Sequence, residues 1–509
     1  MSFNRSAQRA LRRSQASLDQ IALALMVGLV VLAFLLVVLG DHATVKVRDF
    51  SWQAHTVGAD NIAFAITFTR PMDPETVEAN LQIEPPLPGR VSWAGRRLAY
   101  TLDVPIPYGE TYEVRLPEAR DRFSIGQATA TQFEPFTGSF QSRDRAIAYI
   151  GTQADEAGRL MLINFSQAGE TTALTPPDLT VLNFEPYPLG ERLLFSAVPT
   201  AADASGSSTA SLFTVATGLA PLAPEQSLTE AVNVSFAPDA AGTLTPILDG
   251  DEYQNLAFDL APNGKKIVVQ RVNPTSPSDF GPWVIPEGEA PQRLDTEPGG
   301  EFLIGPDSQT LLLLQGQGTA IIPLDLQAEG AIAADPLDFL PEFGRVFDIT
   351  SDGSAAAMVD FNQNDPERRF TETLVFVTID GDETPLLDTT GSILAAEFDP
   401  TNQILYVLAS ELLPGADYQE QPFLTAIALD ESPMLVPLLT FPAQSRVSMN
   451  ISPDGLAIAL EVASPTPDGA AQNLLLPLFQ TTEERLTGTP AQAAPQVLPF
   501  TGVAPTWLP

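Results

Sequence analysis

The chain has 509 residues, of which 44% are hydrophobic and 17% charged, with 46 prolines and 34 glycines. This length and composition predict a folded protein of two or three domains, built from turns and short strands rather than long helices. The formal net charge of −37 repels phosphate backbones, so nucleic acid is not expected as a partner.

The chain has no cysteine and only two histidines, His42 and His55. Disulfides, thiol nucleophiles, iron–sulfur clusters and cysteine–zinc sites are therefore excluded. A Ser-His-Asp triad is nearly excluded, because both histidines lie near the N-terminus.

An uncharged apolar run, Ile21–Leu39, follows four arginines within residues 1–20 and precedes Asp41. Nineteen residues at about 1.5 Å rise approach the roughly 30 Å hydrocarbon core of a bilayer. The positive-inside rule predicts a cytoplasmic N-terminal tail, a transmembrane helix over 21–39 and an extracytoplasmic remainder at the plasma (inner) membrane. The alternative is a cleaved signal peptide, but the apolar run is long for one and no good A-x-A site follows it.

After residue 45 the pattern changes to short strands. Apolar residues alternate through Ile62, Phe64, Ile66 and Phe68, and strand–turn patterns recur at intervals of about ten residues, as in an antiparallel β-sandwich. We expect such a sandwich over residues 45–138, with Met72 and Trp93 in its core.

Two of these segments carry a family resemblance. "FTRPMDPETV" and "YGETYEV" resemble the bacterial Ig-like domain of the SbsA type through matches at Phe68, Pro71, Met72, Asp73, Pro74, Gly109, Thr111, Tyr112 and Val114. Arg70 departs from the family, which often has an acidic or small polar residue there. The resemblance implies an Ig-like spacer or adhesion module without catalytic residues.

The remainder, residues 139–509, repeats one pattern: an apolar strand, a turn of Pro, Asp, Asn or Gly, and a second apolar strand. "ISPDGLAIAL" (451–460) is one copy, and the turn markers Gly264, Ser308, Gly353, Asn402 and Gly455 are 44, 45, 49 and 53 residues apart. That spacing is typical of one four-stranded propeller blade. We expect seven blades, with six or eight as alternatives, and a β-solenoid as the rival architecture. The closing "VAPTWLP" is expected to be the last strand or the cap of the ring.

The "SPDG" form before a strand resembles the TolB-type propeller repeat, although most copies of the turn depart from it. This resemblance implies the fold and says little about function. The predicted fold class is therefore all-β with one N-terminal transmembrane helix: an Ig-like β-sandwich followed by a β-propeller.

No catalytic set is evident: the sequence has no P-loop, no G-x-S-x-G and no Rossmann fingerprint. Weak metal candidates occur in "DFNQNDPERRF", where side-chain oxygens alternate, but the helix-loop-helix calcium pattern fails at its Gly and Glu positions. These candidates for Ca²⁺ are Asp360, Asn362, Asn364 and Asp365. No other cofactor is expected.

The leading functional hypothesis is a membrane-anchored, extracytoplasmic binding protein that uses its propeller as a platform for an envelope protein or glycan. One alternative is a carboxylate-dependent polysaccharide hydrolase or lyase, whose paired acids would come from different blades. Another is a purely structural envelope component. The sequence does not determine the ligand or the oligomeric state.

Overall fold

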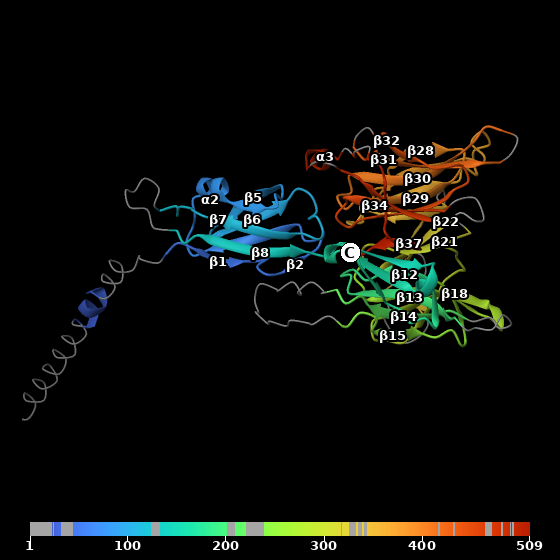
Figure 1. The fold of residues 1–509 in the computed structure, drawn as a ribbon, viewed down its shortest axis with the longest axis horizontal. Helices are drawn as coiled ribbons and strands as arrows, with labels where there is room; N and C mark the ends of the chain where they lie inside the picture. The colour runs from blue at the N-terminus through green and yellow to red at the C-terminus, as the bar shows by residue number, and fades with distance from the viewer. Residues whose placement is uncertain are drawn as a thin grey trace, which may run out of the picture.

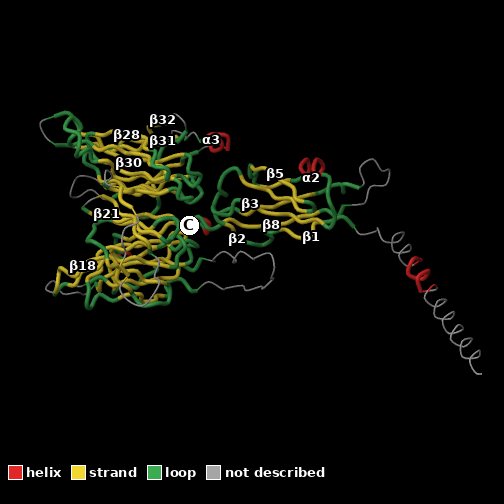
Figure 2. The backbone as a smooth tube through the Cα atoms, turned by 180° about the vertical axis from the view of Figure 1, so that it is seen from behind, coloured by secondary structure: helices red, strands yellow, loops and turns green. Residues whose placement is uncertain are grey.

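The computed structural model describes residues 23, 25–31, 44–123, 133–200, 209–219, 239–316, 318–324, 332–333, 338–340, 344–415, 418–430, 433–463, 471–479, 482–488, 490 and 493–509. Strands dominate this part of the chain, so the predicted all-β class is confirmed. Figure 1 shows two β domains side by side, with the C-terminus at their boundary. Figure 2 shows the same arrangement from behind.

The predicted cytoplasmic tail, 1–20, lies outside the described residues, and so does most of the predicted transmembrane segment, 21–39. Residues 23 and 25–31 are helical. Within the described part of the chain, no helix has both the length and the apolar character required to cross a bilayer.

The first domain is a sandwich of two sheets, ordered β1-β3-β6-β5 and β2-β8-β7-β4. One helix, α2 (Pro74–Asn80), begins at Pro74 and buries Val77. The strands are β1 (Val47–Phe50), β2 (Thr56–Val57), β3 (Ala63–Phe68), β4 (Gln82–Glu84), β5 (Gly89–Ala94), β6 (Arg97–Leu102), β7 (Thr111–Leu116) and β8 (Phe136–Ser142).

The core of the sandwich follows the alternation read from the sequence. Phe64, Ile66 and Phe68 of β3 are buried, and Met72 joins them, while Trp93 packs partly buried against this cluster. Ile62, in contrast, is 61% exposed and precedes the strand. The sandwich also extends past residue 138, because β8 pairs with β7 as far as Thr111↔Gln141. The propeller was predicted to begin at residue 139; residues 139–142 instead belong to the last strand of the sandwich, and the first propeller strand is β9 (Ala146–Gly151).

Beyond residue 145, the described strands form seven sheets, which we number 1 to 7 in the order of their blades along the chain. Their orders, inner strand first, are β37-β9-β10-β11, β12-β13-β14-β15, β16-β17-β18-β19-β23, β20-β21-β22-β24, β25-β26-β27-β28, β29-β30-β31-β32 and β33-β34-β35-β36.

Sheets 1 to 3 contain β9 (Ala146–Gly151), β10 (Leu160–Asn164), β11 (Glu170–Ala173), β37 (Gly502–Trp507), β12 (Leu179–Pro186), β13 (Arg192–Pro199), β14 (Ser211–Ala216), β15 (Leu244–Leu248), β16 (Gln254–Leu260), β17 (Lys266–Asn273), β18 (Ser276–Pro286), β19 (Gln292–Asp295) and β23 (Ile332–Ala333). Short 3-10 helices, η1 (Ala154–Glu156) and η2 (Phe165–Gln167), flank β10.

Sheets 4 to 7 contain β20 (Phe302–Ile304), β21 (Thr310–Gln315), β22 (Gly318–Pro323), β24 (Asp338–Leu340), β25 (Arg345–Ile349), β26 (Ala355–Asp360), β27 (Glu372–Thr378), β28 (Glu383–Thr389), β29 (Ile393–Phe398), β30 (Ile404–Leu412), β31 (Glu420–Ala428), β32 (Met434–Thr440), β33 (Arg446–Ile451), β34 (Ala457–Ala463), β35 (Gln472–Pro477) and β36 (Gln496–Val497). The short helix α3 (Thr482–Thr487) lies between β35 and β36 in the chain.

Among the described side chains, apolar clusters join every pair of neighbouring sheets except sheets 4 and 5, and sheet 7 packs back on sheet 1. The C-terminal strand β37 pairs with β9, so the last strand of the chain closes the ring as predicted. Consecutive sheets packed face to face around a closed ring form a β-propeller, in which each sheet buries both faces only against its neighbours.

The repeated turns join the first and second strands of sheets 2 to 7. Their markers all have positive φ, which a tight turn requires: Gly190, Gly264, Ser308, Gly353, Asn402 and Gly455. We call the end of the propeller that carries these turns the turn end, and the opposite end the free end.

Candidate binding site in the central channel

The inner strands expose apolar side chains to the central channel. Register shifts mark β-bulges at Leu182, Leu256, Phe347 and Leu394, each on the inner strand of its sheet. Leu182, Leu256 and Leu394 are 54%, 56% and 36% exposed. Neighbouring sheets cover the faces of these strands, so an exposed side chain on an inner strand is expected to face the axis of the ring. A bulge redirects a side chain, and here it directs leucines into the lumen.

A second ring lies closer to the turn end. The residue five positions before each turn marker is Glu185, Asp259, Leu303, Asp348, Glu397 or Asn450 in sheets 2 to 7. We call this set the polar belt.

The polar belt joins five pairs of neighbouring inner strands by a hydrogen bond. The backbone N–H of Leu260 donates to Glu185 Oε2 (2.8 Å), Ile304 to Asp259 Oδ2 (2.5 Å), Phe398 to Asp348 Oδ2 (2.8 Å), Ile451 to Glu397 Oε2 (2.9 Å) and Trp507 to Asn450 Oδ1 (2.7 Å). Inner strands are sheet edges with unpaired N–H groups, and the belt satisfies them.

The carboxyl groups of the belt resist ionisation. Burial raises the pKa of Glu397 to about 8, and nearby Asp348 adds to this effect. Burial likewise raises the pKa of Asp348 and of Asp259 to about 6, and the pKa of Glu185 well above its ordinary value. Channel solvent touches part of each side chain, but their depth in the ring makes the charged form costly. The geometry assigns these groups a structural role.

The belt and the apolar packing are both interrupted between sheets 4 and 5. Leu303 has no side-chain oxygen, so the Ile349 N–H bonds instead to Asp348 Oδ1 of its own strand (2.8 Å). Among the described side chains, six clusters join successive sheets, whereas the cluster of Met358, Val375 and Val377 contains residues of sheet 5 alone. We call this interface the seam.

A cavity of about 530 Å³ opens at the seam. Its walls include Leu303, Leu312 and Leu314 of sheet 4, with Val346 and Phe347 of sheet 5, and it extends to Ala257 and Phe258 on the inner strand of sheet 3. Protein interiors contain few voids larger than a water molecule, and ligand pockets have volumes of about 300–1,000 Å³. The cavity therefore has the size and the apolar lining of a binding site.

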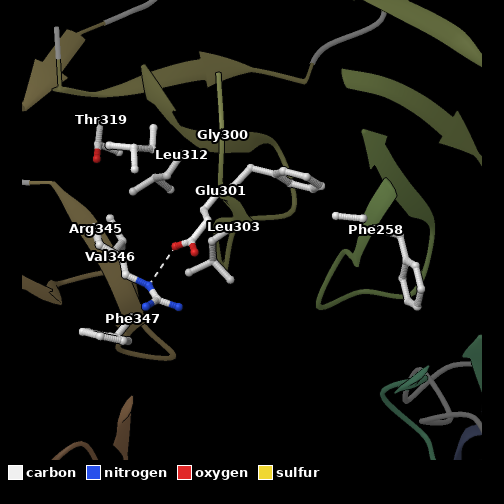
Figure 3. A pocket seen from close by; sticks show the side chains of 12 residues that line it. Phe258, Gly300, Glu301, Leu303, Leu312, Thr319, Arg345, Val346 and Phe347 are labelled. Atoms are coloured by element: carbon white, nitrogen blue, oxygen red, sulfur yellow. Dashed lines mark ion pairs between the residues drawn. The ribbon is translucent and has the colours of Figure 1, made fainter. Parts of the chain in front are cut away.

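Two charged side chains face each other across the mouth of the cavity (Figure 3). Arg345 Nε lies 2.8 Å from Glu301 Oε2, and the Arg345 guanidinium lies 4.6 Å from the centre of the Phe347 ring. Both residues lie at the N-terminal ends of inner strands, so this charged pair lies toward the free end of the propeller. Gly300 lies three residues before Leu303, at the position that a leucine occupies in sheets 2, 3 and 6. Because Gly300 has no side chain, the entrance to the cavity is wider there.

The sandwich is attached at the turn end. The Tyr108 N–H donates to Asp454 Oδ2 (3.0 Å), in the "ISPDG" turn of sheet 7. Arg485 of α3 donates to the Pro105 carbonyl (2.5 Å) and to the Asp454 carbonyl (2.7 Å). On the other side, buried Arg143 donates to the Pro188 carbonyl in the turn of sheet 2 (3.1 Å). The "ISPDG" turn, one copy of the repeated turn, is thus also the point where the first domain is attached.

Hydrogen bonds within their own loop engage three of the four weak metal candidates. The Asn362 N–H donates to Asp360 Oδ1 (2.8 Å), and the buried Asn362 amide donates to Thr371 and Thr373. Asp365 accepts from the Glu367 N–H (2.9 Å), and Asn364 is exposed. Within the described residues, no group of three or more His, Cys, Asp or Glu side chains is placed to hold a metal.

Sequence reasoning missed the belt and the seam. The signal for the belt was present, since Glu185, Asp259 and Asp348 each follow a phenylalanine five residues before a turn marker. The signal for the seam was weaker: Leu303 is apolar, whereas the other copies have an acid or an amide at this position. The volume of the cavity depends on packing between sheets, which no linear motif reports.

No protein-family model matches this chain, and no curated protein sequence matches it. Among solved structures, it is similar to a prolyl endopeptidase (11% identity, 70% of this chain and 50% of that chain, TM-score 0.42). It is also similar to an oligogalacturonate lyase from Vibrio parahaemolyticus (10%, 66% and 92%, 0.44) and to a protein from Agrobacterium tumefaciens described as a TolB (12%, 59% and 90%, 0.31).

The chain spans about half the length of the prolyl endopeptidase. The similar structures include a TolB-type protein, the class that the repeated turn resembles. At these identities and TM-scores, neither an activity nor a ligand carries over from any of them.

Proposed function

We propose that the chain is a bacterial membrane-anchored binding protein whose propeller is an interaction platform for an envelope protein or glycan. Residues 21–39 are its single membrane anchor, with the N-terminus in the cytoplasm and the β domains outside. The sandwich is an SbsA-type Ig-like spacer, and the seven sheets are seven blades of a TolB-type ring.

The observation that carries this proposal is the attachment of the sandwich to the turn end. Bonds from Tyr108, Arg485 and Arg143 hold the two domains together across sheets 7 and 2. The charged pair Arg345–Glu301 of the seam lies at the opposite end of the inner strands, away from the attached sandwich. A rigid spacer that leaves one end of a channel accessible suits a platform that holds a ligand away from a surface.

The test is a comparison of two baits against envelope extract from the organism that encodes the chain. One bait is the full-length chain in mild detergent, and the other carries Gly300→Leu, which fills the entrance to the seam. A side chain fits there, since the nearest atom to an added Cβ is the Leu314 carbonyl oxygen at 4.0 Å. We expect the first bait to retain a specific protein or glycan, identified by mass spectrometry and glycan analysis, and the second to lose it.

Other outcomes separate the alternatives. Retention that is equal for both baits would place the binding surface outside the seam. Turnover of a polysaccharide panel by the full-length chain would replace the platform with a hydrolase or lyase. Neither retention nor turnover would favour the structural envelope component.

A further inference from the structure

We propose that the seam binds an apolar side chain that lies next to a positive charge, as presented by a short basic peptide segment. This inference rests on the proposed binding function and names the ligand class of that site.

The seam is the one interface of the described ring that combines three gaps. It has no cross-sheet apolar cluster among the described side chains, no belt hydrogen bond from Leu303, and no side chain at Gly300. All three gaps coincide at one interface of the ring. An interface left unfilled sacrifices packing energy, which is the usual cost of a site that needs an occupant.

The walls of the seam select an apolar group. β21 alternates: Leu311 and Leu313 are fully buried against sheet 3, whereas Leu312 and Leu314 point the other way and line the cavity. Removing apolar surface from water is the main driving force available in such a pocket, at roughly 25 cal/mol per Å². A sugar would leave its hydroxyls facing leucines without partners, so the walls favour a peptide side chain over a glycan.

The charges at the mouth select a cation. Arg345 is paired with Glu301, and it also acts on Glu372, where it opposes the increase in pKa caused by burial and by Glu420. Two carboxyl groups, those of Glu301 and Glu372, therefore share the Arg345 guanidinium. The side chain of Glu301 is 61% exposed and can turn to an incoming ammonium or guanidinium group.

The field of the whole molecule has the same sign. The net charge of −37 attracts a basic segment and repels an acidic one over distances well beyond contact. Charge complementarity thus favours a basic, apolar peptide as the ligand of the seam. The test must exclude binding of an anionic amphiphile.

The test is fluorescence anisotropy with the full-length chain in mild detergent and labelled tetrapeptides. The probe is Lys-Leu-Phe-Lys, matched by Glu-Leu-Phe-Glu, which reverses the charge, and by Lys-Ser-Ser-Lys, which removes the apolar groups. We expect the probe to bind at least tenfold more tightly than either matched peptide. Raising the salt concentration should weaken binding of the probe, because salt screens the attraction between the charges.

Two variants locate the binding. Gly300→Leu should abolish binding of the probe, while its thermal melt stays at the wild-type temperature. Glu301→Gln should weaken binding about threefold to tenfold, whereas Glu170→Gln, an exposed carboxylate on the outer strand β11, should leave it unchanged. Equal loss for both Glu variants would mean that only the general field acts, and would overturn the role of the seam.

The outcomes distinguish failure of this inference from failure of the proposed function. Tighter binding of the acidic peptide, or equal binding of the polar one, would overturn the ligand class. If no peptide binds, but the wild-type bait retains envelope material that the Gly300→Leu bait does not, the ligand class would be wrong and the proposed binding function would remain. No peptide binding and no retained material would overturn both.

Discussion

The interface between sheets 5 and 6 and the seam between sheets 4 and 5 use the same architecture and differ in what fills it. Sheets 5 and 6 share a cluster that includes Leu374, Phe398 and Leu405, and Asp348 bonds across it to the Phe398 N–H. The seam has a cavity where that cluster would be, and Leu303 where the acid would be. Ring closure thus tolerates one incomplete interface when the other six are filled, which frees that interface for binding.

Breaking the filled interface should produce the largest effect. Leu405 is fully buried between sheets 5 and 6. We expect Leu405→Ala to destabilise the propeller by about 2–5 kcal/mol, because it removes buried methyl groups and leaves a cavity. The measurement is the midpoint of urea unfolding followed by tryptophan fluorescence. A loss below about 1 kcal/mol would contradict the description of this interface as tightly packed.

Breaking the attachment of the sandwich should cost less. Asp454 is 1% exposed and accepts from Tyr108, Ser452 and Leu456. Asp454→Ala leaves these donors without their acceptor, so we expect a loss of about 1–3 kcal/mol in urea unfolding. Hydrogen exchange should also rise over residues 103–110.

The matched control for this prediction is Asp307→Ala, in the corresponding turn of sheet 4. Asp307 accepts from Gln309 and Thr310 within its own turn, and it is exposed. Asp307→Ala should reduce stability through the loss of the hydrogen bonds within its own turn, without increasing hydrogen exchange over residues 103–110. Equal exchange in both variants would show that Asp454 stabilises only its own turn.

The buried carboxyl groups of the belt should make the stability of the propeller depend on pH. The pKa of Glu397 is raised from 4.5 to about 8, so its stabilising contribution is complete below about pH 4.5 and is lost as pH rises to 8. Glu397→Gln keeps an oxygen for the Ile451 N–H and cannot ionise. We expect the variant to stay within about 1 kcal/mol of the wild type at pH 5 and to exceed it at pH 8.5 by more than about 1 kcal/mol, because each unit by which the pKa is raised corresponds to about 1.4 kcal/mol.

Thermal melts across pH 5 to 8.5 provide the measurement, with Glu170→Gln as the surface control. A variant less stable than the wild type at pH 8.5 would mean that the Glu397 carboxylate is ionised and favourable in the ring.

The sequence predicted the propeller because its turns are local: Pro, Asp and Gly fix φ within four residues, and the copies recur at blade spacing. It also predicted that the C-terminal strand closes the ring. It did not predict the second role of Asp454, because a turn aspartate bonded to its own loop looks the same with or without a partner 346 residues away. The seam was equally hidden, since Leu303 is an ordinary strand residue until the neighbouring sheet is placed beside it.

The smallest effect should come from the seam itself. Leu312→Ala makes the same chemical change as Leu405→Ala, but Leu312 is only partly buried and already lines a cavity. The substitution removes fewer contacts and creates little new void, so we expect a loss below about 1 kcal/mol. Urea unfolding of the two variants under the same conditions measures the difference. If Leu312→Ala cost as much as Leu405→Ala, the seam would be a packed interface, and the case for a ligand within it would fail.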